Sequence, residues 1–331
     1  MVNSSYIFEL LRPADAEGVS RLFTEVYGDA YPIKMVYDPK QLIAALESHD
    51  NIPIVARTVS GKIIAYMAFY RSSPNKALYE FGQTLVLPEY RNSTVFGLLS
   101  RHIARIAPTL PGVEAAFCEN VCNHTDTQRA AALFKYIEAT IEIDLMPVEA
   151  YEKEQSAAGR VSAINMFRTY IPKPHTVYVP DRYGDYLRYI YAGFDDGRTL
   201  VPSTGELPTG QSTETTVQIF DFASVARITV LEAGRDFKES FSMEEDAALS
   251  RDVKVIQVWL KSSWPWISEV VNILRNKGYF FGGVLPRWFN EDGLLMQKII
   301  GQPNWEGINL YSSRAKTILE FVKNDWKELQ G

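Results

Sequence analysis

Residues 78–107 constrain the fold more than any other part of the chain. Their pattern predicts an apolar strand at 78–87, a polar turn at 88–94 and an amphipathic helix after it. The helix is closed by Pro108 and has apolar residues at steps of three and four, namely Val95, Leu98, Leu99, Ile103 and Ile106. A helix that begins at Ser93 or Thr94 leaves its first main-chain N–H groups without intrahelical acceptors, at the positive end of the dipole. The sequence therefore predicts a site for the phosphates of a nucleotide-like cofactor.

Length and composition indicate a globular protein with two domains. At 331 residues the chain exceeds the usual span of one hydrophobic core, and 46% hydrophobic residues supply ample apolar area. A net charge of −6 without runs of Lys or Arg argues against a nucleic-acid-binding protein.

The chain shows no sign of a membrane segment or of a metal site. No apolar stretch approaches the roughly 20 residues of a membrane span, and residues 1–5 lack a basic start followed by an apolar core. We therefore expect a cytoplasmic protein that binds no membrane. Cys118 and Cys122 stand four residues apart without a second pair, so we expect them to be packing residues and not zinc ligands.

The first 150 residues predict the element order β-α-α-β-β-β-α-β-α-β. Asp38 followed by Pro39 predicts a helix start, and Ser60-Gly61 predicts a hairpin turn. Thr125 is a predicted N-cap that Gln128 completes as a capping box. Strands are expected at 6–11, 54–59, 62–70, 78–87, 113–118 and 140–146, and helices at 12–27, 40–48, 93–107 and 125–136.

This order, together with Leu87-Pro88-Glu89-Tyr90-Arg91 before a turn and a helix, resembles the GNAT N-acetyltransferases and their pyrophosphate loop. The resemblance implies a mixed, mostly antiparallel sheet flanked by helices, and acetyl-CoA or another acyl-CoA as cofactor. It assigns the cofactor contacts to the loop residues Arg91, Asn92, Ser93, Thr94, Val95 and Phe96. The family usually has a small residue where this chain has Thr94 and Phe96.

The same resemblance implies catalytic roles. Glu80, eleven residues before Arg91, matches the place of a general base, with Tyr79 and Gln83 near enough to hold a relay water. Tyr136 matches the tyrosine that protonates the leaving thiolate. The donors to the thioester carbonyl are expected among the main-chain N–H groups of Leu85, Val86 and Leu87. The alternatives are a solvent-facing Glu80 and a Tyr136 that only packs in the core.

The acceptor site is expected between the first two helices, where the family shapes it. Tyr27, Asp29 and Tyr31 lie in this loop, and their charge and ring faces suit a cationic small-molecule or peptidyl amine. The alternative is an aromatic loop that is simply anchored to the domain surface.

We predict a domain at 1–150, a connecting segment at 151–214 with one helix, and a second domain at 215–331. In the last of these, strands at 216–222, 226–232 and 253–260 precede a helix that ends at Lys277-Gly278-Tyr279, followed by strands at 279–285 and 293–299. This order resembles the C-terminal half of another GNAT domain without its coenzyme loop. Such a degenerate copy would serve as a wall of the acceptor pocket or as a pairing surface, for example in a homodimer. Gly282-Gly283 is explained by a tight hairpin.

Two hypotheses follow. The first is an acyl-CoA-dependent N-acyltransferase that works by direct transfer. The second is a non-catalytic binding or assembly module, because Thr94 and Phe96 fill the cofactor loop. A doubly wound nucleotide-binding enzyme is disfavoured, since no Gly-x-Gly-x-x-Gly or Walker loop is present.

Overall fold

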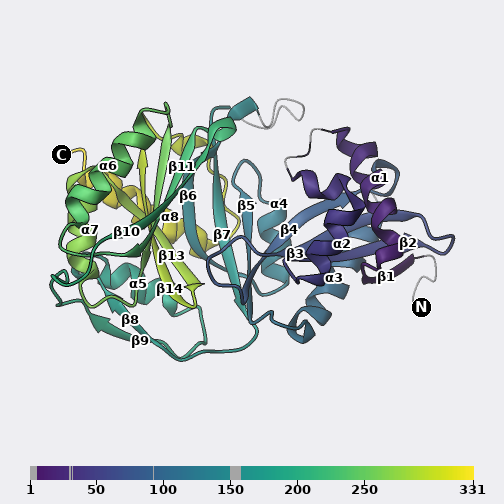
Figure 1. Ribbon diagram of the computed structural model, residues 1–331, viewed down its shortest axis with the longest axis horizontal. Coiled ribbons are helices and arrows are strands. Elements are labelled where there is room, and N and C mark those ends of the chain that lie inside the picture. The colour runs from purple at the N-terminus through teal and green to yellow at the C-terminus, as the bar shows by residue number, and fades with distance from the viewer. Residues whose placement is uncertain (1–5, 30, 32, 92, 150–157) are drawn as a thin grey trace. The chain divides into compact units, whose positions relative to one another are not determined.

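The computed structural model describes residues 6–29, 31, 33–91, 93–149 and 158–331 (Figure 1). The chain divides into two compact units, residues 1–118 and residues 119–331. The division falls inside strand β5 (Ala115–Val121). The domain borders at 150 and 214 remain predictions.

The first unit is built on a mixed sheet in the order β1-β2-β3-β4-β5, in which β1 to β4 are antiparallel and β4 is parallel to β5. Its strands are β1 (Tyr6–Leu10), β2 (Asn51–Thr58), β3 (Ile63–Tyr70), β4 (Leu78–Val86) and the first part of β5. Its helices are α1 (Ala16–Tyr27), α2 (Pro39–Glu47) and α3 (Val95–Ile106).

Helices cover both faces of this sheet because neighbouring strand residues point in opposite directions. The ring of Tyr66 packs against Phe23 of α1 at 5.2 Å between centroids, whereas the Met67 sulfur lies 3.9 Å from the Ser100 hydroxyl of α3. The predicted start of α2 is confirmed, since Asp38 accepts a hydrogen bond from the N–H of Lys40 at 2.9 Å.

The second unit holds the sheet order β7-β6-β13-β14-β12-β11-β10, antiparallel except for β11 and β12, and a separate parallel pair β8-β9. Its strands are β6 (Ile137–Met146), β7 (Val161–Thr169), β8 (Thr176–Val179), β9 (Thr199–Pro202), β10 (Glu214–Phe220), β11 (Val225–Glu232), β12 (Val255–Lys261), β13 (Phe280–Phe289) and β14 (Glu291–Ile299). Its helices are α4 (Asp126–Leu133), α5 (Gly184–Tyr191), α6 (Phe237–Leu249), α7 (Ile267–Asn276) and α8 (Ser313–Glu328), the last of which packs on β13 and β6.

Strands β6 and β13 meet in the middle of this sheet. Gly283 pairs with Thr140, and a Cβ on Gly283 would lie 2.4 Å from the carbonyl oxygen of Ala139. Gly283 also has φ +132°, which L side chains rarely adopt. The explanation of Gly282-Gly283 by a tight hairpin is therefore wrong, because Gly283 makes room for β6 and Gly282 for Leu295 of β14; the hairpin turns later, at Asn290.

The predicted fold class is confirmed, since both units are mixed, mostly antiparallel sheets with flanking helices. The order β4-α3-β5-α4-β6-β7 returns as β11-α6-β12-α7-β13-β14. The sequence patterns did not predict α6, α8 or the pair β8-β9. No helix in the described ranges is both long enough and apolar enough to cross a membrane.

The capping box expected at Thr125 is wrong. Gln128 instead donates through Nε2 to the carbonyl oxygens of Val121, His124 and Asn309, at 2.9 to 3.2 Å. The whole Gln128 residue is only 2% exposed. Its side-chain amide, which the capping box would have used, therefore bonds to a segment that is far away in the sequence.

Candidate active site

Glu80 lies on β4 beside the tyrosine that faces it on β3. Tyr70 is the antiparallel partner of Glu80, and the Tyr70 hydroxyl donates a hydrogen bond to Glu80 Oε1. Gly82 permits this contact, because a Cβ there would stand 3.1 Å from the Tyr70 hydroxyl oxygen. Glu80 is half-buried, so its carboxylate is positioned by a neighbour and is not a freely solvated surface group.

A second tyrosine, Tyr31, lies near enough to this carboxylate to interact with its charge. The Tyr31 ring packs in a tilted arrangement against Tyr27, at 5.1 Å between centroids, and against Phe23, at 4.9 Å. Its main-chain N–H donates to the Tyr37 hydroxyl at 2.9 Å. Burial raises the pKa of Tyr31 well above its usual value, and the neighbouring Tyr27 and Glu80 raise that pKa further. The structure therefore brings three predicted residues, Glu80, Tyr27 and Tyr31, into one cluster.

Asp29 does not join this cluster. Its side chain is exposed, and its main-chain carbonyl accepts a hydrogen bond from Lys34 Nζ at 2.6 Å. A role for Asp29 at the acceptor site remains a prediction.

A β-bulge interrupts β4 three residues after Glu80. Gln83 has φ +53°, and neither Gln83 nor Thr84 has a register partner in β3. The Gln83 side chain fixes the bulge, because its Oε1 accepts hydrogen bonds from Asn51 Nδ2 at 3.1 Å and from the Tyr66 hydroxyl at 3.2 Å. The bulge leaves main-chain groups of β4 outside the regular ladder, directly beside the Glu80 cluster.

These contacts also alter two predictions made for the neighbours of Glu80. The Tyr79 hydroxyl donates to the carbonyl oxygen of His49 at 2.9 Å, so it does not hold a relay water for Glu80. The main-chain N–H of Leu87 donates to the carbonyl oxygen of Ile64 at 2.9 Å, which removes Leu87 from the set of carbonyl donors.

The parallel pairing of β4 with β5 stops early. The register runs from Leu78–Ala115 to Glu80–Phe117, whereas β4 continues to Val86. The far half of β4 therefore leads to the start of α3 without this partner. The β-bulge and the early end of the β4-β5 pairing both lie on the strand-turn-helix unit at residues 78–107 that the sequence singled out.

The α3 start was predicted correctly, with Thr94 as N-cap, but its amides are only partly open. The N–H of Ser93 donates to the carbonyl oxygen of Tyr90 at 3.1 Å, and that of Val95 to Ser93 Oγ at 3.2 Å. The expectation that the amides around Ser93 stay free is therefore wrong for these two. For the N–H groups of Phe96 and Gly97 we find no acceptor among the residues that the structure describes.

Phe96 is 39% exposed. Gly97 is a further opening that the motif comparison missed, since a Cβ there would have nothing within 4 Å. Arg91 is held by a hydrogen bond from its Nε to the carbonyl oxygen of Val86, at 3.2 Å. Asn92, another predicted contact, lies outside the described residues.

Tyr136 belongs to the second unit, whereas Glu80 belongs to the first. It follows Lys135, which has φ +62°, and its N–H closes the end of α4 on the carbonyl oxygen of Ala131 at 3.1 Å. Its side chain is buried, with the hydroxyl 3.3 Å from that of Tyr170. Helix α4 accordingly ends at Leu133, three residues before the predicted end.

No protein-family model and no curated protein sequence matches this chain. Among solved structures, the spermidine/spermine N-acetyltransferase SpeG of Vibrio cholerae is similar at 12% identity and TM-score 0.40, over 51% of this chain and 95% of its own. The ribosomal-protein-S18-alanine N-acetyltransferase of Escherichia coli is similar at 16% identity and TM-score 0.38, over 50% of this chain and 94% of its own. The structures that this chain resembles are GNAT acetyltransferases.

The second unit contains a strand-helix start that corresponds in order to β4-α3 of the first unit, but the loop before its helix is bonded to another segment. The N–H of Arg235 donates to the carbonyl oxygen of Pro208 at 3.0 Å, and that of Gly234 to Thr213 Oγ1 at 3.1 Å. The Asp236 carboxylate in turn accepts from the N–H of Thr213 at 2.9 Å. Residues 208–213 therefore bond to the amides of Gly234 and Arg235, which lie just before α6.

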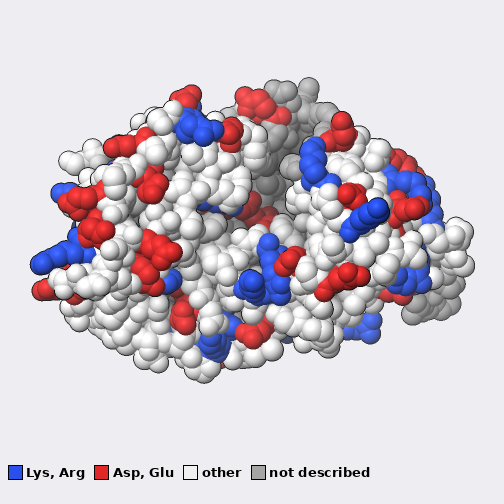
Figure 2. Space-filling model, in the orientation of Figure 1, with Lys and Arg blue, Asp and Glu red and all other residues white. Residues whose placement is uncertain are grey.

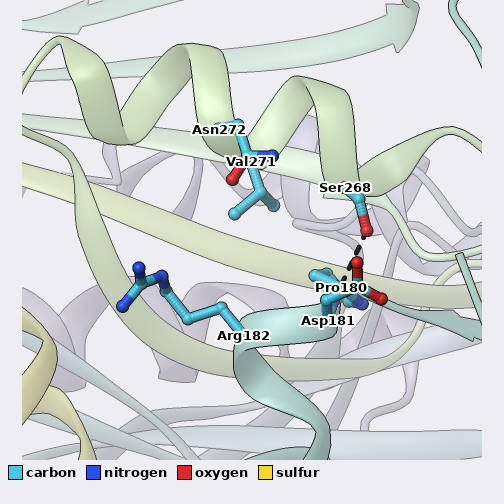
Figure 3. Close-up of a pocket in the computed structure, with 6 residues that line it drawn as sticks. All are labelled: Pro180, Asp181, Arg182, Ser268, Val271 and Asn272. Carbon is cyan, nitrogen blue, oxygen red and sulfur yellow. Dashed lines mark hydrogen bonds between the residues drawn. The ribbon is translucent and has the colours of Figure 1, made fainter.

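A surface cavity of about 460 Å³ lies between η6 (Asp181–Tyr183) and α7 in the second unit (Figure 3). The Ser268 hydroxyl points to Asp181, whose main-chain N–H donates to it at 3.4 Å, and Arg182 pairs with Glu328 of α8. Because these groups already bond within the protein, we do not place a reaction here.

On the face drawn in Figure 2, acidic and basic side chains are interspersed.

Proposed function

We propose that the first domain, residues 1–150, is an acyl-CoA-dependent N-acyltransferase that transfers an acyl group, most simply acetyl, to a small-molecule or peptidyl amine. The observation that carries this proposal is the arrangement of one continuous segment. A carboxylate positioned by Tyr70, a β-bulge and two helix N–H groups that have no acceptor among the described residues follow each other along β4 and α3. These groups suit proton removal, carbonyl polarisation and diphosphate binding, in that order.

Glu80 takes the role of the general base. Tyr70 orients its carboxylate, and the ring faces of Tyr27 and Tyr31 attract the ammonium group of the acceptor. After Glu80 has removed a proton, the amine nitrogen is free to form the new C–N bond. In this proposal the bulge at Gln83 and Thr84 supplies a main-chain N–H for the developing oxyanion, two residues before the predicted Leu85 and Val86.

At the start of α3, where the predicted binding loop ends, the described residues fit a bound acyl-CoA. The open N–H groups of Phe96 and Gly97 are suited to the diphosphate, with Arg91 nearby to add positive charge. Acyl-CoA, when bound, supplies the activated thioester. Tyr136 is kept as the proposed proton donor to the thiolate, with its hydroxyl next to that of Tyr170.

In the same proposal, residues 215–331 are a degenerate second copy joined by a connecting segment at 151–214. The repeated element order supports this proposal. The ends of α4 and α7 support it too, because each is closed by the same kind of main-chain hydrogen bond. Tyr279 closes α7 on Leu274 at 3.1 Å after Gly278, as Tyr136 closes α4 on Ala131 after Lys135. The covered start of α6 gives the second copy no coenzyme site. A cytoplasmic location and a homodimer remain predictions.

The second candidate function is a binding or assembly module without catalysis. It is favoured by the internal hydrogen bonds of Ser93 and Val95, which leave fewer amides for a diphosphate. Calorimetry with CoA and a thioester-turnover assay with Glu80→Gln separate the two candidates. Binding with turnover that Glu80→Gln abolishes supports the enzyme, whereas binding of other ligands without turnover supports the module.

The sharpest test of the cofactor site is Gly97→Asp. Space for the side chain is open, and an acidic residue in the first helical turn stabilises the helix, so the fold should survive. The new carboxylate should repel the diphosphate and lower CoA affinity by about tenfold or more. Gly210→Asp is the matched control, because Gly210 also has nothing within 4 Å and lies in the second unit. Equal CoA binding by both variants would reject the proposed site.

A further inference from the structure

A cluster of two carboxyl groups and one guanidinium lies in the second unit, apart from the proposed active site. Arg227 Nη2 is 3.5 Å from Glu119 Oε2 and 3.8 Å from Glu142 Oε1. Arg227 is fixed from its other side, because its Nε donates to Gln257 Oε1 at 2.6 Å and its guanidinium lies over the Trp259 ring. One cation thus faces two acidic groups.

Glu142 lacks a partner for one of its oxygens. Gln257 Nε2 donates to Glu142 Oε1 at 2.9 Å, but Oε2 is buried and has no hydrogen-bond partner among the described residues. The Asn165 side-chain oxygen, which is also buried, is unpaired in the same way. Two unpaired acceptors in a site that is 2% exposed indicate that a proton is held there.

The charges around Glu142 agree with this. Burial raises the pKa of Glu142 to about 8, and Glu119 raises it further while Arg227 acts in the opposite direction. Cys122 is the other titratable group facing Glu142, and burial raises its pKa well above the ordinary value. At neutral pH Glu142 is therefore held protonated beside Arg227.

A cavity of about 150 Å³ opens beside this group. It is lined by Glu119 and Arg227 and by apolar side chains that include Phe220, Phe222 and Met146. The Phe222 residue is 65% exposed and the Glu119 side chain 31%, so both are accessible. A cavity of this volume accommodates a benzene-sized group.

We propose that this cavity binds a small organic cation with an apolar body of benzene size, its ammonium group lying against Glu119, which lines the cavity and shares Arg227 with the buried Glu142. The ligand's charge takes the place of the proton: Glu142 releases its proton to solvent, and the net charge of the site is unchanged. An anion of the same size would face two carboxyl groups and only one guanidinium whose hydrogen bonds are engaged. This site is independent of the proposed transferase reaction.

The test uses the full chain and phenethylammonium as the probe, with calorimetry at neutral pH in phosphate and in Tris. These buffers differ in ionisation enthalpy, so proton release appears as a difference in the measured heat. We expect millimolar or tighter binding with release of up to one proton. Benzoate should not bind. Absence of amine binding, tighter binding of benzoate or binding without proton release would overturn the proposal.

Variants locate the site. Glu119→Gln should weaken amine binding by about tenfold, and Phe222→Ala by about threefold to tenfold. Glu232→Gln is the matched control, a carboxylate that is 36% exposed and paired with Lys261, and should leave affinity unchanged. Glu80→Gln should also leave it unchanged. If Glu80→Gln abolishes binding while Glu119→Gln does not, the amine binds in the first unit and the inference is wrong.

Discussion

The starts of α3 and α6 occupy the same place in two similar runs of elements, but the chain in front of them is packed differently. Each helix follows a strand that is parallel to the next one, β4 with β5 and β11 with β12. At α3 the N–H groups of Phe96 and Gly97 have no acceptor among the described residues, whereas residues 208–213 bond to the amides before α6. The shared element order therefore does not give the two helix ends a shared function.

What differs is a distant segment and not the helix itself. Gly234 lies where a Cβ would be 1.9 Å from the carbonyl oxygen of Gln211, while a Cβ on Gly97 would meet nothing within 4 Å. An anion site at a helix end requires amides that remain accessible. The connecting segment fills the space beside Gly234, just before α6, whereas the space at Gly97 of α3 is open.

The largest effect expected from this comparison concerns these two glycines. Gly234→Ala should destabilise the protein by about 3 kcal/mol, because the methyl group overlaps main-chain atoms of Gln211 that a rotamer change does not move. Gly97→Ala should be neutral or stabilising by up to about 1 kcal/mol, since alanine has the higher helix propensity. Urea unfolding monitored by circular dichroism measures both. Similar effects in the two variants would show that residues 208–213 do not cover α6 tightly.

The buried polar groups of the two units provide a second comparison. In the first unit Asn51, Gln83 and Tyr66 bond to one another, and burial raises the pKa of Tyr66, so this network stays neutral. In the second unit burial raises the pKa of Glu142 from its ordinary value of 4.5 to about 8 in the folded protein. The folded protein therefore binds this proton more tightly than the unfolded chain, and stability should fall as pH rises from 4.5 to 8.

Glu142→Gln should remove this part of the pH dependence and stabilise the protein by about 2 kcal/mol at pH values above the folded-state pKa of Glu142. The reason is that the neutral amide NH2 group replaces the unpaired Glu142 oxygen and can donate to the unpaired Asn165 oxygen. His175 adds a fall of the same sign: burial opposes its protonation, but Asp292 at 3.2 Å raises its pKa overall. The measure is therefore the difference between wild type and variant in urea unfolding across pH. A difference that does not change with pH would show that Glu142 is not protonated when folded.

The smallest expected effect compares the ends of α4 and α7. Both helices end on a residue with positive φ, Lys135 at +62° and Gly278 at +88°. Lys135→Gly should raise stability by up to about 1 kcal/mol, and Gly278→Ala should lower it by about 1 kcal/mol, because glycine alone adopts this conformation without steric cost. Thermal unfolding gives both values. Shifts of equal sign would mean that the two turns are not equivalent.

Local patterns in the sequence predicted most elements of the first unit. The apolar steps from Val95 to Ile106, the pair Asp38-Pro39 and the turn at Ser60-Gly61 each encode their structure within a few residues. Helix α6 was missed, since its buried face alternates apolar Phe237 and Phe241 with the charged Glu245. The cluster of Glu80 with Tyr27 and Tyr31 was anticipated only through family resemblance, because Tyr70, its direct partner, depends on strand register.

The sequence by itself determined where most strands and helices of the first unit begin, and that one helix start follows a buried strand as an anion site requires. Only the tertiary structure decided which amides remain open, that Gln128 serves Asn309 and that Gly283 makes room for β6. The physical reason is distance along the chain. Propensities and caps act over one or two turns, whereas access to a helix end or a strand edge depends on segments that are brought together by packing of the whole unit.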